Sequence, residues 1–164
     1  MQTKSSGLAE GSLQADGSLP AKSSFSWPVQ VYYEDTDCGG VVYHSNYLKF
    51  MERARTEWLR HLGLQQDVLI DKFGVIFAVR TLSIDYLKPA LFNQMLRVET
   101  YLEKPGKVSL LFKQLIYLVN EKNNNELLSS ADVKIVSLAY DKQNNKMMGP
   151  KKLPAEIYQL MFNN

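Results

Sequence analysis

Residues 31–60 read VYYEDTDCGGVVYHSNYLKFMERARTEWLR, and this stretch decides the fold because its character changes once along its length. Its first half sets three carboxylates ahead of Gly39-Gly40, a composition that favours a turn. Its second half repeats apolar residues at the spacing of one helix face. The stretch therefore predicts a chain that leaves a strand, turns, and enters a helix.

A helix is predicted over about residues 46–62. Ser45 and Asn46 are favourable N-cap residues, and Gly63 is a favourable residue to end the helix. The side chains between them separate into two faces. The apolar face consists of Tyr47, Leu48, Met51, Ala54, Trp58 and Leu62, and the polar face of Lys49, Glu52, Arg53, Thr56 and Arg60. Such a helix is expected to bury its apolar face against a sheet.

Strands are expected on both sides of this helix. Aromatic and β-branched residues are dense over 25–34, which predicts a first strand. After a shorter helix at 65–72, turn-forming residues divide the chain into further strands, which are 75–87, 95–103, 108–120, 127–140 and a brief 146–148. A short helix is expected after Pro154. The order predicts an α+β domain in which one long helix packs on an antiparallel sheet of about five strands.

Composition restricts the class of protein. The chain has 164 residues, 45% of them hydrophobic, and a formal net charge of +2, so one globular domain that does not bind nucleic acid is expected. Residues 1–24 contain no aromatic residue and are rich in Ser, Gly and Ala, which predicts a disordered tail before a domain at 25–164. The single Cys38 forms no internal disulfide, and no apolar run is long enough to span a bilayer. A cytoplasmic location is expected, with peripheral attachment to the inner membrane left open.

The turn ahead of the helix carries the candidate reactive side chains. Asp37 and His44 lie between the end of a strand and the start of a helix, where free backbone N–H groups favour negative charge. A thioester carbonyl that becomes an oxyanion would be stabilised there, while a carboxylate attacks it or activates a water. Both residues also have a structural interpretation, Asp37 as a turn-capping carboxylate and His44 as a helix-capping or buried histidine. Asp35 is expected to be a structural hydrogen-bonding residue.

This segment resembles the signature of the 4-hydroxybenzoyl-CoA thioesterase family, and most of all its YbgC-type branch, the thioesterases associated with the Tol-Pal system. The similarity is densest over 27–62 and extends more weakly to about residue 160. It implies a hotdog fold, in which a curved antiparallel sheet wraps around the long central helix. It also implies a homodimer with its active sites at the subunit interface, although the sequence does not separate a homodimer from a homotetramer.

The resemblance implies a role for individual residues. Asp37 falls on the catalytic carboxylate, as nucleophile or as general base. His44 falls on the histidine before the helix, whose own backbone N–H lies where the oxyanion is expected, and Tyr33 falls on a strand tyrosine that lines the site. The residues expected to bind substrate are Gly40, Val41, Val42 and Tyr43 beside the thioester, and Lys104 and Lys107 beside the CoA nucleotide. A solvated hairpin tip explains the two lysines equally well.

Together these observations predict an enzyme that hydrolyses acyl-CoA, or an acyl carrier protein thioester, to the free acid and the thiol. No metal and no diffusible cofactor is expected, because two histidines and one cysteine are too few for an ordinary zinc site. Two alternatives stay open. One is a hotdog 3-hydroxyacyl dehydratase, for which Glu52 is the only glutamate that could face inward from the helix. The other is a non-catalytic protein that binds acyl carrier protein or envelope partners.

Overall fold

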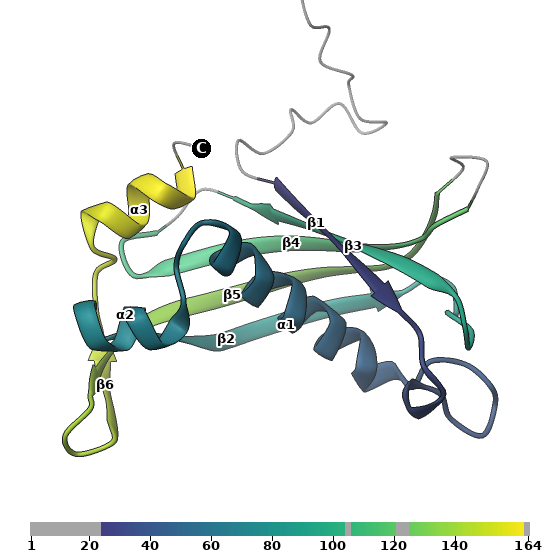
Figure 1. Cartoon of the computed structure of the whole chain (residues 1–164), viewed down its shortest axis with the longest axis horizontal. Coiled ribbons are helices and arrows are strands. Elements are labelled where there is room, and N and C mark those ends of the chain that lie inside the picture. The colour runs from purple at the N-terminus through teal and green to yellow at the C-terminus, as the bar shows by residue number, and fades with distance from the viewer. Residues whose placement is uncertain (1–23, 104–105, 121–124, 163–164) are drawn as a thin grey trace, which may run out of the picture.

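The computed structural model describes residues 24–103, 106–120 and 125–162. Helix α1 (His44–His61) lies across one face of a curved antiparallel sheet, as Figure 1 shows. The predicted α+β domain built on one long helix is confirmed. The other elements are, in chain order, β1 (Ser24–Gln30), the 3-10 helix η1 (Tyr33–Asp35), α2 (Gln66–Phe73), β2 (Val75–Tyr86), β3 (Met95–Leu102), β4 (Ser109–Leu118), β5 (Glu126–Asp141), β6 (Lys146–Pro150) and α3 (Ala155–Phe162).

The strands pair in the order β1-β3-β4-β5-β2, every pair is antiparallel, and β6 adds to β5. The sheet therefore has six strands rather than about five, because the brief strand expected at 146–148 extends to Pro150 and pairs with the end of β5. Ser24, which the sequence assigned to the tail, pairs with Tyr101 as the first residue of β1. Residues 1–23 and Lys104 lie outside the described residues.

A β-bulge in β2 keeps a row of apolar side chains on the helix-bearing face of the sheet. The register shifts between Val79 and Thr81. Val79 pairs with Ile135 and Leu82 with Val133, two residues of the core under α1. Because side chains of a strand alternate between faces, Val79 and Leu82 would lie on opposite faces without the bulge. Both remain accessible, with exposed fractions of 53% and 37%.

The first strand ends earlier than predicted. β1 stops at Gln30, whereas the pattern of aromatic and β-branched residues continues to residue 34. The carboxylate of Asp35 accepts a hydrogen bond from the Tyr32 N–H at 2.9 Å and draws the chain into the 3-10 helix η1. A local side-chain bond thus overrides strand propensity, which depends on packing partners that this segment lacks.

Helix α1 starts at His44, two residues before the predicted start, and Tyr43 occupies the N-cap position. Asn46 does not cap the helix, because its side-chain amide donates to the backbone carbonyl of Asp35 at 2.9 Å. The predicted end is confirmed: Gly63 follows the helix with a φ of 76°, a left-handed conformation that favours glycine.

The core forms where α1 packs against the sheet. Phe50, Met51 and Ala54 are completely buried, and Trp58 meets the ring of Phe112 edge-on with 5.5 Å between centroids. Burial of each large apolar side chain contributes about 1.5–3 kcal/mol. On the opposite flank α2 packs against β2, while α1 lies nearest to β1 and β3.

One polar cluster is buried inside this core. Gln114 on β4 is fully buried, and its Oε1 accepts a hydrogen bond from Nη1 of Arg55 at 2.6 Å. Its Nε2 donates to the Met51 carbonyl at 3.0 Å and to the Thr100 hydroxyl at 2.9 Å. Burial lowers the pKa of Arg55, and the nearby negative charge of Glu52 opposes that shift. Gln114 therefore ties the middle of α1 to two strands.

Replacement of Gln114 by Leu is expected to lower the free energy of unfolding by about 2–4 kcal/mol, because a buried guanidinium loses its acceptor. Urea denaturation followed by circular dichroism measures the change. The control is Thr100→Val, which removes one neutral hydroxyl from the same cluster and should cost about 1 kcal/mol. Equal midpoints for Gln114→Leu and wild type would show that Arg55 does not depend on Gln114.

Candidate active site

The loop between η1 and α1 is a short hairpin-like turn. Thr36 and Val42 form an antiparallel bridge, and inside it the Asp37 N–H donates to the Val41 carbonyl at 2.9 Å. The Gly40 N–H donates back to the Asp37 carbonyl at 3.0 Å, and Gly40 has a φ of 76°. A left-handed residue is required at this corner, so glycine is the favoured residue there. The turn fixes the position of the Asp37 backbone.

The Asp37 carboxylate is held on one side only. Its Oδ1 accepts a hydrogen bond from the Gly39 N–H at 2.8 Å, as expected for a turn-capping carboxylate. Its Oδ2 bonds to none of the residues that the structure describes, and the residue is exposed. A Cβ at Gly39 would lie 3.1 Å from Oδ1, so a larger residue would displace the carboxylate. The structural and the reactive interpretation of Asp37 are therefore compatible.

His44 is the first residue of α1, and its side chain is exposed. Within the described parts of the chain, no group accepts a hydrogen bond from its backbone N–H. Its ring is tilted against that of Tyr43, with 4.3 Å between centroids, and meets the ring of Tyr86 edge-on at 6.4 Å. The free N–H at the helix N-terminus provides a donor for a developing negative charge.

Asp35 anchors the loop to the helix. It is 7% exposed, and its backbone carbonyl accepts hydrogen bonds from the Tyr43 N–H and the Asn46 amide, both at 2.9 Å. Its carboxylate holds the Tyr32 N–H on the other side of the turn. Asp35 thus has the structural role that was predicted for it. The part played by Asn46 was not predicted, because an Asn at this position looks like an ordinary N-cap.

Two tyrosines complete the surroundings of the helix start. The Tyr86 hydroxyl, from the end of β2, donates to the His44 carbonyl at 3.0 Å. The Tyr47 hydroxyl accepts a hydrogen bond from the Ala90 N–H at 2.8 Å. Burial raises the pKa of both tyrosines, so both keep their protons at neutral pH. Their sequence positions gave no sign of this, since Tyr47 fits an apolar helix face and Tyr86 fits a strand.

The residues expected along the thioester do not share one environment. Gly40 and Tyr43 are exposed and Val41 is half-buried. Val42 is 4% exposed and belongs to the core, while its backbone N–H donates to the Ala90 carbonyl at 2.8 Å. Gly40, Val41 and Tyr43 are therefore accessible from solvent, whereas the Val42 side chain is used for packing.

Tyr33 does not lie on a strand. It belongs to η1, its side chain is 81% exposed, and its ring meets Phe92 edge-on at 6.1 Å. The expected strand position is wrong because the chain turns before this residue. Tyr33 and Phe92 form an exposed aromatic pair at the same end of the molecule as the Asp37 loop.

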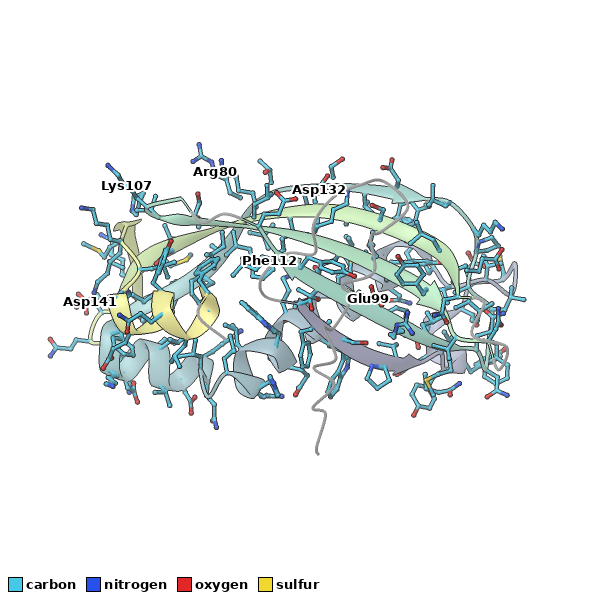
Figure 2. The ribbon with its side chains drawn as sticks, turned by 90° about the horizontal axis from the view of Figure 1, so that it is seen from above. Arg80, Glu99, Lys107, Phe112, Asp132 and Asp141 are labelled. Carbon is cyan, nitrogen blue, oxygen red and sulfur yellow. The ribbon has the colours of Figure 1, made fainter. Side chains whose placement is uncertain are left out.

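Lys107 lies far from the Asp37 loop within one chain. β1 leads to the loop through Gln30, which pairs with Met95 at the start of β3. The connection that carries Lys107 follows the opposite end of β3, where Tyr101 pairs with Ser24. Figure 1 shows the loop and this connection at opposite ends of the sheet, and Figure 2 shows Lys107 pointing into solvent.

Residues 39–123 match the family model described as "Thioesterase superfamily" (4HBT), which is more than half of the chain. The chain belongs to this thioesterase superfamily. The predicted thioesterase is thereby confirmed at the level of the family.

Individual members of the superfamily resemble most of this chain. It is 41% identical to "Acyl-CoA thioesterase YbgC" of Haemophilus influenzae, over 84% of this chain and 97% of that one. It is 44% identical to "Acyl-CoA thioester hydrolase YbgC" of Escherichia coli O6:H1, over 82% and 96%. Among solved structures, the 4-hydroxybenzoyl CoA thioesterase of Pseudomonas sp. strain CBS-3 superposes with a TM-score of 0.74 at 17% identity, over 84% of this chain and 99% of that one. The hotdog fold expected for the thioesterase family is confirmed.

In residues 24–103, 106–120 and 125–162, no group of three or more His, Cys, Asp or Glu side chains is placed to hold a metal ion. No helix in the same residues combines the length and the apolar character that crossing a bilayer requires.

Replacement of Asn46 by Ala is expected to destabilise the thioesterase by about 1–3 kcal/mol, because the buried Asp35 carbonyl loses one of its two donors. Amide hydrogen exchange of residues 36–43 should become faster in the variant. Ser45→Ala, one residue earlier in the same helical turn, is the matched control. It should change the free energy of unfolding by no more than about 0.5 kcal/mol and leave the exchange of residues 36–43 unchanged. Unchanged exchange in Asn46→Ala would contradict the anchoring role.

Proposed function

We propose that this protein hydrolyses acyl-CoA thioesters to a free acid and CoA. The observation that supports this most is the Asp37 carboxylate, which is fixed through Oδ1 while Oδ2 stays available, in a loop that leads into a helix with a free N-terminal N–H. The similarity to acyl-CoA thioesterases over more than four-fifths of the chain supports the same activity.

In the proposed reaction the thioester carbonyl oxygen accepts a hydrogen bond from the His44 backbone N–H. Attack on the carbonyl carbon then places negative charge on this oxygen, where the helix N-terminus stabilises it. Asp37 acts in one of two ways. As a nucleophile it forms a mixed anhydride, expels the CoA thiolate, and is freed by water. As a general base it takes a proton from the water that attacks. In either case the exposed His44 imidazole positions the water.

Wild-type protein is expected to release thiol from acyl-CoAs, and Asp37→Asn is expected to lower kcat by about 10²–10⁴, the usual contribution of a general base. His44→Ala should lose less activity, because alanine keeps the backbone N–H that binds the oxyanion. Thiol release is measured with a colorimetric thiol reagent on short-chain, long-chain and aromatic acyl-CoAs.

The matched control is Glu34→Gln, which neutralises an exposed carboxylate in η1, just before the Asp37 loop. This variant should keep wild-type kcat. If Glu34→Gln lowered kcat as much as Asp37→Asn, the result would contradict a specific catalytic role for Asp37. Absence of thiol release from any acyl-CoA or acyl carrier protein would refute the hydrolase itself. Acyl carrier protein as a partner, independence of metals and cofactors, and a cytoplasmic location stay predictions.

The active form is proposed to be a homodimer joined through β2. In the described sheet β2 pairs only with β5, so its other edge is free, and its helix-bearing face exposes Val79, Leu82 and Tyr86. A long, apolar free edge favours pairing with another strand. Antiparallel pairing of two β2 strands would place the far end of one subunit beside the Asp37 loop of the other. The partner subunit's Lys107 would then lie at the same end as the active site.

Replacement of Leu82 by Lys is expected to convert the dimer to a monomer and to reduce thioester hydrolysis at least tenfold. Leu82 lies near the middle of β2, so two lysines would approach each other across the two-fold axis and repel. Light scattering coupled to size-exclusion chromatography measures the mass. Met147→Lys, at a more exposed apolar residue on β6, is the control and should leave the mass unchanged. A monomeric wild type with full activity would contradict this proposal.

A further inference from the structure

A second site lies between α1 and the sheet, outside the Asp37 loop. Here the structure has a cavity of about 110 Å³ that opens to solvent. Its walls are mostly apolar, and Figure 2 shows Phe112 on β4 reaching into the space between sheet and helices. Its apolar lining includes Leu59, Phe77, Leu110 and Phe112, and its two charged residues are Arg55 and Glu52. Glu52 is exposed and accepts a hydrogen bond from the Thr56 hydroxyl, whereas Arg55 is buried. A cavity with apolar walls and a buried cation is suited to a ligand that has both an apolar and an anionic part.

Arg55 is an unusual residue for such a wall. Its side chain is buried, with an exposed fraction of 8%, and among the described residues it makes one hydrogen bond, to the neutral Gln114. A guanidinium has five N–H donors, so the others are available to the cavity. No Asp or Glu of the described chain lies within ion-pair distance of it. Glu52 on the same wall opposes the downward pKa shift of Arg55, but Glu52 is exposed and makes no ion pair with it. A buried cation without an ion-pair partner is costly, and an anion bound directly to it would relieve that cost.

We propose that this cavity holds the distal end of the acyl group and that Arg55 makes the enzyme prefer acyl chains that end in a carboxylate. The proposal rests on the thioesterase function proposed above. The apolar walls pack against the methylene groups, and the guanidinium binds the terminal carboxylate through charge-assisted hydrogen bonds. Arg55 is thus a specificity-determining residue that does not touch the reacting atoms.

The distance between the two sites sets the chain length. Arg55 and His44 lie on the same helix, and a helical side chain points back toward the N-terminus, over the preceding turn. In agreement with this, Gln114 contacts both Arg55 and the Met51 carbonyl. Met51 follows His44 by about two helical turns, roughly 10 Å along the axis. At roughly 1.3 Å per chain atom, this span fits an acyl group of about eight carbons.

Strand β2 provides a route between the two sites. Phe77 and Val79 line the cavity, and Tyr86 at the other end of the strand bonds to His44. The bulge keeps Val79 and Leu82 on the helix-bearing face, so apolar side chains continue from one site toward the other. An extended alkyl chain could lie along this row with its thioester at His44 and its terminus at Arg55.

The test compares octanoyl-CoA with 7-carboxyheptanoyl-CoA, which has the same number of acyl carbons and a terminal carboxylate. Wild type is expected to have a kcat/KM about tenfold or more higher for the carboxylated chain, because hydrogen bonds to a charged group are the stronger ones. Arg55→Met should reverse the preference, chiefly through a higher KM for the carboxylated chain. Arg53→Met is the matched control, since Arg53 is exposed on the polar face of the same helix.

A second variant covers the case in which Arg55→Met does not fold. Gln66→Glu alters an exposed residue of the cavity wall outside the proposed dimer surface and adds a carboxylate to the cavity. It should abolish the preference for the carboxylated chain without a change at Arg55. Equal kcat/KM values for the two chains in wild type would overturn the proposal, and so would an unchanged preference in Gln66→Glu.

Direct binding separates this proposal from the proposed function. Calorimetry should show that octanoate binds to wild type at least tenfold more tightly than 1-octanol, and that Gln66→Glu removes the difference. Octanoate binding without any thioester turnover would leave the Arg55 site standing and refute the hydrolase. Hydrolysis of acyl-CoAs with no selective octanoate binding would leave the hydrolase standing and refute the Arg55 site.

Discussion

Burial of α1 against the concave face of the sheet is the interaction on which the rest of the structure depends. Phe50, Met51, Ala54 and Trp58 remove the apolar side of the helix from water, and the sheet must curve to cover them. A helix packed in this way has a fixed axis, so the position of its first residue, His44, is also fixed. The free N–H groups at the helix start therefore occupy a defined place at one end of the molecule.

The loop before α1 shows how environment separates chemically identical groups. Asp35 and Asp37 are two residues apart, yet Asp35 is buried and uses its carboxylate and its carbonyl to hold the loop. Asp37 is exposed, and only one of its carboxylate oxygens accepts a hydrogen bond within the turn. Because Asp35 ties the loop to Asn46, the loop does not need the Asp37 side chain to stay closed. This division leaves Asp37 available for chemistry.

The placement of α1 over β1 and β3 has a consequence at the other side of the sheet. Strand β2 is left partly uncovered, and its bulge turns Val79 and Leu82 toward the helix side. The apolar surface that results serves two proposed purposes, pairing with a second subunit and guiding an acyl chain. The pairing surface and the acyl-chain surface have the same origin, because a single helix of this diameter cannot cover a sheet of this width.

The sequence by itself determined the order of elements, the central helix, the turn at Gly39-Gly40 and the candidacy of Asp37 and His44, because these depend on local periodicity, on turn chemistry and on a long motif. It did not determine the early end of β1 or the start of α1, since side-chain bonds of Asp35 and Asn46 decided both. The contact between Tyr86 and His44 and the bond between Arg55 and Gln114 join residues 42 and 59 positions apart. Only the tertiary structure could decide these, because the pairing of distant residues depends on how the helix and the strands pack, and no local pattern encodes it.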